Sequence, residues 1–295
     1  MTAPVLADAL GPRARRKVLI ASVVTGAALA ALLGVAVQRL VDKGQLEWAR
    51  WEPLTQWSVL KFLLGGLGDT LRAAFAGMTL ALLIGAALAL LRLAQTAVVR
   101  WLATAWTEFF RGVPLLLLIF FSYSGLRQYG IDISPFRALV LALALYNGAM
   151  LGEIFRAGIL SLDRGQTEAA YAIGLSYWQA MLQVVIPQAA RRMTPAIVSQ
   201  LITLLKDTSL GFVITYEELL RRSRSTGEFF RNPLQVTVFV AVLYIAVNFT
   251  LSRIARRLEV RQRRRLGAGA IATTTGVEDL AVVSVSAAAA VRDDH

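Results

Sequence analysis

Six stretches of the chain are apolar enough to form helices that cross a membrane. A helix rises about 1.5 Å per residue, so roughly 20 apolar residues are needed to cross a hydrocarbon core about 30 Å thick. The sequence therefore predicts an all-α integral membrane protein with six transmembrane helices. The expected spans are residues 18–37, 71–91, 113–126, 136–155, 194–214 and 233–254.

The third of these spans is the shortest, and helix-breaking residues lie at its start. Gly112 and Pro114 are the fifth and the last residue of the sequence EFFRGVP. Proline lacks the backbone N–H of a helical hydrogen bond, and a membrane helix tolerates it where neighbours satisfy the freed groups. We therefore expect this span to have a broken or kinked entry.

Composition excludes several classes of function. The chain has 295 residues, is 56% hydrophobic and carries a formal net charge of +12. Its basic residues cluster at the ends of apolar spans, a pattern that indicates membrane topology and anionic lipid rather than nucleic acid. It has no cysteine, and its single histidine is the terminal His295, so cysteine metal sites and histidine-based nucleophilic catalysis are excluded. No metal site and no catalytic residue are expected.

The absence of a GxxxxGK[ST] loop excludes one further activity. That loop holds the phosphates of ATP in many ATPases. Without it, any ATP used with this protein must be bound by another chain, and no cofactor is expected on this one.

Charge at the ends of the spans predicts the topology. Basic residues at positions 13–17 precede the first span, which is too long for the core of a signal peptide. We therefore expect a transmembrane helix with a cytoplasmic N-terminus, and six spans return the C-terminus to the same side. Lys and Arg favour the cytoplasmic segments, although the arginine-rich outer segment 216–232 runs against this trend.

Two further segments fall outside the predicted spans. Residues 38–66 contain Trp48, Trp51 and Trp57, which favours a segment lying along the outer membrane surface. A loop with buried aromatic side chains fits the same pattern. Residues 259–295 begin with arginines and continue as a low-complexity tail, which we expect to be disordered.

The stretch 163–189, between the fourth and fifth spans, has the pattern of two short helices joined by a hinge. Asp163 and Ser176 are each followed three residues later by a glutamine, which is the spacing of a capping box. Gly174 can take the left-handed conformation that ends the first helix. Pro187 is expected to end the second.

Four motifs in this order give the chain a family resemblance. They are EFFRGVP at 108–114, EIFRAGI at 153–159, the EAA-x3-G stretch at 168–174 and LLKDTSL at 204–210. Over residues 66–258 the chain resembles the permease subunits of binding-protein-dependent ABC importers, in the polar amino-acid branch. The cytoplasmic EAA loop of that family docks on the ATPase subunit.

The resemblance implies an architecture and a set of partners. The fold would be a type I importer permease with a five-helix core and one extra N-terminal helix. The expected divisions are residues 1–66, a transmembrane domain at 67–258 with its EAA loop at 158–190, and the tail at 259–295. Implied partners are an ATPase subunit that uses ATP, an external solute-binding protein, and a second permease, identical or paralogous. The implied location is the bacterial inner membrane, with membrane lipid around the spans and both termini in the cytoplasm.

The resemblance also implies roles for particular residues. The substrate would be a polar amino acid, with glutamate or glutamine as the first expectation. Apolar side chains of the loop, at Ile173, Leu175, Trp178 and Met181, suit docking on the ATPase. Glu168 either pairs with a basic residue of the ATPase or serves the positive end of its own helix. The residues expected to couple the two subunits are Glu168, Ala169, Ala170, Tyr171, Gly174 and Pro187.

A polar turn in the fifth span is the candidate for the substrate path. If that span starts near Pro195, Lys206 lies about 16 Å along it, near the middle of the bilayer. Charges at that depth are costly and usually face the bundle interior or a water-filled path. Asp207 and Thr208 follow it, and Asn147 and Glu153 of the fourth span are weaker candidates. The alternative is an ion-pair network that only fixes the helix.

Two other classes of membrane protein stay open on the sequence. An ion-coupled secondary transporter would carry its own ion-coupling residues and often shows inverted repeats. An intramembrane hydrolase would need a nucleophile with a base, or a pair of aspartates. The chain has a single deep aspartate, Asp207, and no evident repeat.

Overall fold

The computed structural model describes residues 11–254, 256 and 257, and every regular element in this part of the chain is helical. Five helical runs are long and apolar enough to cross a membrane. The expected basic and low-complexity tail, residues 259–295, lies outside the described residues. The five runs are α1 (Pro12–Asp42), α3 (Trp57–Arg92), α7 (Pro135–Leu160), the run Tyr177–Ile214 that contains α10 (Ile186–Asp207), and the helix Pro233–Ile254.

The third expected span is a bent pair of helices, as its glycine and proline predicted. The first arm is α4 (Ala97–Gly112), and the second arm comprises α5 (Leu115–Phe120), a π turn at Phe121–Gly125 and α6 (Leu126–Gln128). The arms meet at 98°. Val113 is extended and Pro114 cannot donate a helical hydrogen bond, so the break falls between them. Counted as one span, this pair brings the described part to six.

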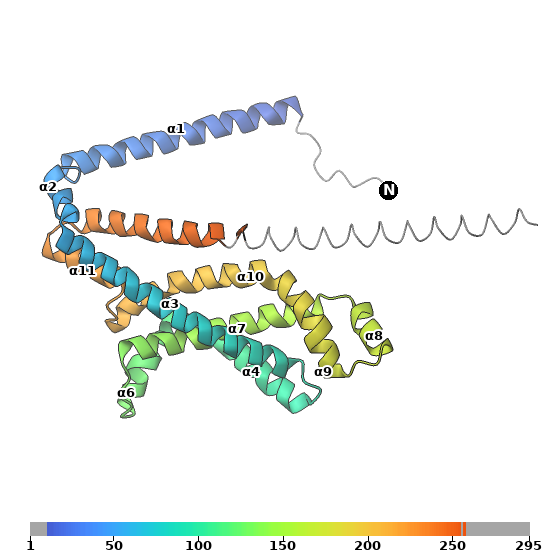
Figure 1. The fold of residues 1–295 in the computed structure, drawn as a ribbon. Coiled ribbons are helices and arrows are strands. Elements are labelled where there is room, and N and C mark those ends of the chain that lie inside the picture. The colour runs from blue at the N-terminus through green and yellow to red at the C-terminus, as the bar shows by residue number, and fades with distance from the viewer. Residues whose placement is uncertain (1–10, 255, 258–295) are drawn as a thin grey trace, which may run out of the picture.

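The centre of the bundle is the contact between α3 and α7, which run side by side (Figure 1). Small residues let their backbones approach. A Cβ added at Gly85 would lie 2.8 Å from Leu151 Cβ, and one at Gly148 would lie 2.7 Å from Ile84 Cγ2. Membrane helices associate through such close packing because lipid leaves little hydrophobic force between them. These glycines therefore fix the distance between the two central spans.

The expected outer segment 38–66 is shorter than predicted. It holds a short helix α2 (Trp48–Trp51) and a 3₁₀ turn at Glu52–Thr55, and α3 begins already at Trp57. α3 continues through Gly65 and Gly66 without a break. Gly66 packs against the start of α11 (Leu219–Phe229). A Cβ at Gly66 would lie 3.0 Å from Leu219 Cα. Of the three tryptophans, Trp48 and Trp57 are exposed, whereas Trp51 packs on a buried cluster around Leu54 and Leu63.

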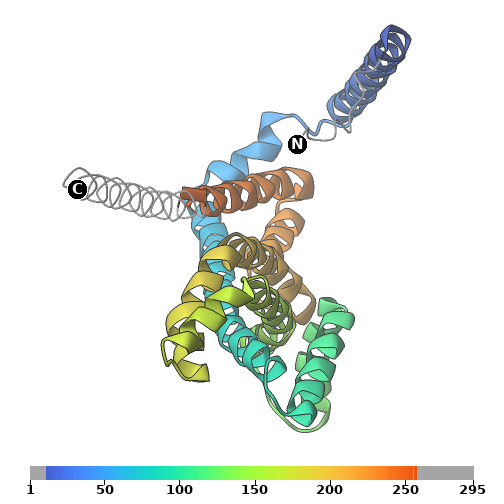
Figure 2. The same cartoon turned by 90° about the vertical axis from the view of Figure 1, so that its right-hand side faces the viewer.

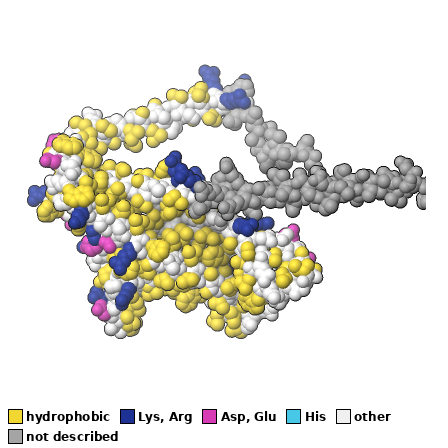
Figure 3. Space-filling view, in the orientation of Figure 1, with side chains coloured by type: hydrophobic (Ala, Val, Ile, Leu, Met, Phe, Trp, Pro, Cys, Tyr) yellow, Lys and Arg dark blue, Asp and Glu magenta, His cyan; other side chains and the backbone are white. Residues whose placement is uncertain are grey.

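The N-terminal helix α1 stands apart from the other spans. None of its apolar window is buried by the rest of the described chain. It joins the bundle at its C-terminal end, through the segment that leads to α2 (Figures 1 and 2). In the space-filling view, hydrophobic side chains cover α1 and much of the bundle, and most charges lie near the ends of the spans (Figure 3). This distribution is the one expected of a protein surrounded by lipid.

Candidate coupling loop and translocation path

The loop between the fourth and fifth spans forms the two helices that the sequence predicted. In the first, α8 (Arg164–Ala172), Asp163 is the N-cap and accepts a hydrogen bond from Gly165 N at 2.9 Å. Gly174 ends it at φ +85°. Gly174 N donates to Tyr171 O at 2.9 Å and Leu175 N donates to Ala170 O at 3.1 Å. These two bonds form a Schellman motif, which satisfies carbonyls at the end of the helix.

The second helix, α9 (Tyr177–Ala180), starts as predicted but does not end at Pro187. Ser176 N donates to Gln179 Oε1 at 2.9 Å, which is half of the expected capping box. The helix continues through a π turn at Met181–Val185 into α10, where Pro187 lies in the first turn. The expectation that Pro187 is a terminator is therefore wrong. Pro187 cannot donate a backbone hydrogen bond, and the wider π turn directly before α10 lets the helix continue without that bond.

Two contacts fasten the loop to the inner end of α10. Gln188 Nε2 donates to Gln166 Oε1 at 3.0 Å, and Arg192 Nη1 donates to Ser161 O at 2.7 Å. Gln166 was expected to complete a capping box with Asp163; its side-chain oxygen instead accepts from Gln188. α9, the π turn and α10 therefore form one helical run, which connects the loop directly to a membrane span.

The surface of the loop is partly apolar. Tyr171, Ile173 and Trp178 are exposed, as a docking face requires, and Glu168 and Ala169 are exposed beside them. Three expected contact residues face inward instead: Ala170 and Met181 are buried and Leu175 is half-buried. Met181 lies in the π turn and lines a cavity together with Ile159 and Leu160 at the C-terminal end of α7. A cavity of about 290 Å³ between α7 and the loop is lined by Tyr171 and Tyr177 among others.

The candidate path residues differ in burial and in the contacts they make. Asn147 is fully buried in α7, and its Oδ1 accepts from Gln200 Nε2 of α10 at 2.8 Å. Lys206 is exposed, Asp207 is half-buried and Thr208 is buried, donating to Leu205 O at 2.7 Å. Among the described residues, neither Lys206 nor Asp207 forms an ion pair. An ion-pair network within this chain therefore does not account for them.

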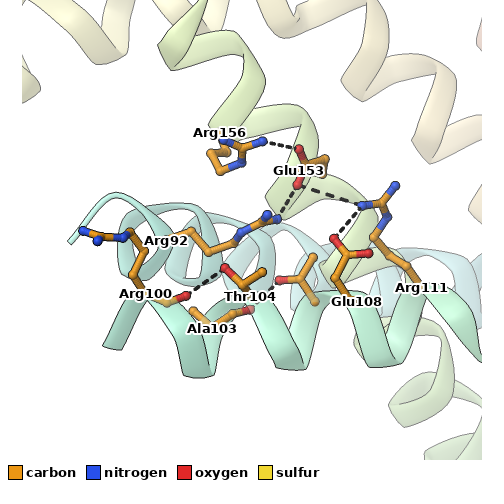
Figure 4. A network of polar contacts seen from close by, with 9 residues as sticks. Arg92, Arg100, Ala103, Thr104, Glu108, Arg111, Glu153 and Arg156 are labelled. Atoms are coloured by element: carbon orange, nitrogen blue, oxygen red, sulfur yellow. Dashed lines mark hydrogen bonds and ion pairs between the residues drawn. The ribbon is translucent and has the colours of Figure 1, made fainter. Parts of the chain in front are cut away.

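Glu153, by contrast, is the centre of an ion cluster in the part of α7 that leads into the coupling loop (Figure 4). It pairs with Arg92 of α3, with Arg156 of its own helix at 2.6 Å, and with Arg111 of α4 at 4.0 Å. Arg111 also contacts Glu108 at 3.3 Å. The carboxylate thus joins α3, α7 and α4, the first arm of the bent span. Sequence reasoning found Glu153 and Arg156 but missed Arg92 and the role of Arg111, although Arg111 lies inside the EFFRGVP motif.

A second polar cluster, at the start of α11, was missed entirely by the sequence analysis. Glu218 is fully buried and caps α11, accepting from Leu220 N at 2.8 Å and Arg221 N at 2.7 Å. Tyr244 Oη donates to the same carboxylate at 3.1 Å. Burial raises the pKa of Glu218 to about 7, more than the hydrogen bonds lower it. An acidic residue directly before an amphipathic segment is an N-cap signal, and this signal could have identified Glu218 from the sequence.

Neighbouring contacts hold this outer cluster against α3. Arg222 Nη2 donates to Asp69 Oδ2 at 2.6 Å, and Leu219 N donates to Thr70 Oγ1 at 3.1 Å. Tyr216 Oη donates to Asp69 O at 2.9 Å. The start of α11 is therefore bonded both to α3 and, through Tyr244, to the helix Pro233–Ile254. Burial raises the pKa of the Tyr216 phenol to about 12.

Comparison with known proteins decides the family. The model of the binding-protein-dependent transport system inner membrane component family matches residues 77–264. The chain belongs to this family. It is therefore a multi-pass membrane permease subunit, without catalytic activity of its own, and the ATPase of the importer is a separate subunit.

Individual relatives of this permease agree with the assignment. It is 39% identical over 236 residues to the glutamate transport system permease protein GluD of Corynebacterium glutamicum, covering 78% of this chain and 84% of that one. It is 43% identical over 209 residues to the probable glutamine ABC transporter permease protein GlnP of Bacillus subtilis, covering 69% and 94%.

Solved structures confirm the type I importer fold of the permease. A chain of an amino acid ABC transporter crystallised with histidines superposes with a TM-score of 0.67 at 32% identity, covering 70% of this chain and 97% of that one. A chain of the methionine transporter MetNI, at 20% identity, has the same fold with a TM-score of 0.60. In both comparisons about 30% of this chain has no counterpart.

Proposed function

We propose that this permease subunit forms the translocation path for a polar amino acid in a bacterial inner-membrane importer. The observation that carries the proposal is the capped, exposed loop α8–α9, which continues as one helical run into α10. The expectation that the substrate is glutamate or glutamine is supported by relatives such as the glutamate permease GluD and the probable glutamine permease GlnP. Basic amino acids come second, since an arginine permease of Bacillus subtilis is 35% identical.

In this proposal the loop couples the ATPase subunit to the membrane span. The ATPase binds the exposed face that includes Glu168, Ala169 and Tyr171, with Ala170 and Gly174 holding the shape of the hinge. When ATP closes the ATPase dimer, the loop moves with it, and Pro187, in the first turn of α10, carries the motion into the span. Each state must bind nucleotide or the loaded binding protein better than the other for this coupling to operate.

The same proposal includes an orientation of the chain in the membrane and a role for the candidate path residues. Both termini face the cytoplasm, so the coupling loop and the Glu153 ion cluster lie inside, and α11 lies outside toward the solute-binding protein. A second permease, identical or paralogous, completes the path. Lys206, Asp207 and Thr208 lie along that path, and Asn147 and Glu153 support it by holding α7 to its neighbours. No contact in the described residues favours the ion-coupled alternative.

Transport by the assembled complex tests the proposal. The chain, its ATPase, its second permease and its binding protein are reconstituted in vesicles, and uptake of labelled glutamate, glutamine and arginine is measured with and without ATP. The expected result is ATP-dependent uptake of at least one of them, with glutamate or glutamine preferred. Uptake of a sugar or phosphate with no amino-acid uptake would overturn it.

A further inference from the structure

The helix α4, the first arm of the bent span, has three different faces around its axis. One face includes Ala103 and Thr107 and is buried where α4 packs on α3 and α7. A second face is exposed and apolar, and its members are Val98, Trp101, Leu102, Ala105, Trp106 and Phe109. Between these two lies a polar edge, whose members are four, four and three residues apart: Arg100, Thr104, Glu108 and Arg111. The bundle therefore leaves an amphipathic surface of α4 uncovered.

The direction of α4 indicates that it lies along the membrane surface. It meets the second arm at 98°, so the two arms do not cross the membrane in the same direction. Arg100 and Arg111, at the two ends of the polar edge, are about 16 Å apart along the helix axis. A crossing helix would spread these charges over that depth of hydrocarbon, which is costly. A helix parallel to the surface holds both charges at one level, beside the headgroups.

The length of the second arm agrees with this placement. As a helix, Leu115–Gln128 rises about 21 Å, which is about 9 Å less than a hydrocarbon core about 30 Å thick. Interfacial amphipathic helices bury their apolar face about 5–10 Å into the boundary between headgroups and acyl chains. With α4 at that depth, the second arm is long enough to reach the opposite surface.

The polar edge of α4 faces the ion cluster of Glu153 (Figure 4). Three arginines share that carboxylate, and Glu108 contacts one of them. The three are Arg92, Arg111 and Arg156. Three arginines with two carboxylates leave one positive charge in excess, and Arg100 of the same edge raises the excess to two.

Arg100 is the arginine of the polar edge that has no counter-charge in the described part of the chain. Its side chain is exposed, and Nη1 donates to Ala94 O at 3.1 Å and to Gln95 O at 3.3 Å. None of the ion pairs among the described residues includes it. Trp101 follows it, at the border between the polar edge and the apolar face, and tryptophan favours the headgroup level of a membrane. An exposed guanidinium group at that level suits a lipid phosphate.

We propose that α4 lies along the inner surface of the membrane and that Arg100 binds the phosphate headgroup of an anionic phospholipid. The inference rests on the proposed function for the side of the membrane, because that orientation places α4 in the same half as the coupling loop. The excess of positive charge favours an anionic headgroup over a zwitterionic one. The bound lipid and the contact between Arg111 and Glu153 then hold the two ends of α4, one to the membrane and the other to α7.

Depth measurements test the placement of α4. The chain has no native cysteine, so Val98→Cys and Phe109→Cys introduce single thiols at the two ends of the apolar face. The full complex, reconstituted in vesicles, carries a nitroxide at one of these thiols at a time. A parent complex treated in the same way corrects for thiols of the partner chains. The exposure of each nitroxide to oxygen and to a water-soluble nickel chelate gives its depth.

We expect the two nitroxides to lie at the same depth to within one helical turn, about 5 Å, and to be open to oxygen from the lipid. A crossing helix would separate them by about 16 Å, and that result would overturn the inference. Nitroxides that neither probe reaches would also overturn it, because a partner chain would then cover α4.

Fluorescence quenching tests the lipid. Ala97 is exposed one turn before Arg100, and Ala97→Cys carries a bimane fluorophore in the same vesicles. Brominated phosphatidylglycerol, which is anionic, and brominated phosphatidylcholine, which is zwitterionic, compete for this position, and quenching gives the ratio of their affinities. Arg100→Gln removes the charge. Arg137→Gln is the matched control, because Arg137 is an exposed arginine in the first turn of α7, at the end opposite to Glu153.

We expect phosphatidylglycerol to bind more tightly while Arg100 is intact, and Arg100→Gln to reduce this advantage about five-fold, as the loss of one interfacial charge predicts. Arg137→Gln should leave the ratio unchanged, and inorganic phosphate should not displace the lipid at constant ionic strength. Equal affinities with Arg100 intact, an unchanged ratio in Arg100→Gln, an equal fall in Arg137→Gln, or displacement by inorganic phosphate would each contradict the inference. Neither measurement involves transport, so a complex that takes up no amino acid would refute the proposed function separately.

Discussion

Gln200 of α10 donates a hydrogen bond from Nε2 to Oδ1 of the fully buried Asn147 of α7, at 2.8 Å. Asn147 in turn donates from Nδ2 to Leu143 O of its own helix at 3.1 Å. The pair therefore satisfies a buried amide and joins the span that continues from the coupling loop to the centre of the bundle.

Replacing Gln200 by Leu should destabilise the complex by about 1–3 kcal/mol, since Asn147 Oδ1 would be buried without a donor. The lowered melting temperature of the purified complex is the measurement. Thr203→Val is the control on the same helix, because Thr203 bonds only to Ser199 O one turn away. Equal melting temperatures for the two variants would contradict the assignment.

Replacing Gly174 by Val should uncouple ATP hydrolysis from transport. Gly174 has φ +85°, and an L residue resists that conformation by about 1–2 kcal/mol per residue. Gly130→Val is the matched control: Gly130 has φ +80°, and neither glycine has a neighbour within 4 Å of an added Cβ. The backbone strain is then similar, but Gly130 lies in the loop between α6 and α7. Transport and ATPase copurification should fall only for Gly174→Val, and normal values for both would show that the hinge does not couple.

Replacing Glu153 by Gln should destabilise the inner end of the bundle by about 1–3 kcal/mol, because Arg92, Arg111 and Arg156 lose their shared carboxylate. Arg92 is the most buried of the three, so its unpaired charge dominates the cost. Glu108→Gln removes an exposed carboxylate that contacts Arg111 only, and should cost less than about 1 kcal/mol. Thermal unfolding of both variant complexes compares them, and a larger cost at Glu108 would refute the central role of Glu153.

The buried Glu218 should make stability depend on pH. Its pKa is about 7 in the folded protein against 4.5 for an unperturbed glutamate, so the folded state holds a proton that the unfolded state releases. This contribution is fully present below about pH 4.5 and is lost as the pH rises to about 7, a change on the order of 3 kcal/mol. Tyr244 donates a hydrogen bond to this carboxylate, the backbone N–H groups of Leu220 and Arg221 donate two more, and Glu217 lies beside it on its own segment.

Melting temperatures from pH 5 to 8 check this dependence. Glu218→Gln cannot titrate, so the difference between parent and variant should change across that range. Glu217→Gln, at an exposed carboxylate, should follow the parent. Parallel curves for parent and Glu218→Gln would show that Glu218 does not titrate there.

The sequence by itself determined the membrane class, the number of spans, the bend before the third span and the hinge at Gly174. Each of these depends on local chemistry: apolar length, the missing N–H of Pro114, or a backbone angle that glycine adopts freely. The order of four short motifs also predicted the family, which the family model and the relatives confirmed. The location of the path and the contacts of the coupling loop stay predictions.

Only the tertiary structure decided which distant residues meet. Arg92, Arg111 and Glu153 come from three helices, and Glu218 meets Tyr244 across two, so no periodicity along the chain reveals these clusters. The course of the helix past Pro187 depended on a π turn stabilised by packing of Met181 and Val185. The exposure of Lys206 and the partial burial of Asp207 likewise depend on which face of α10 packs against its neighbours. Long-range packing and helix rotation are properties of the assembled bundle, and local sequence does not specify them.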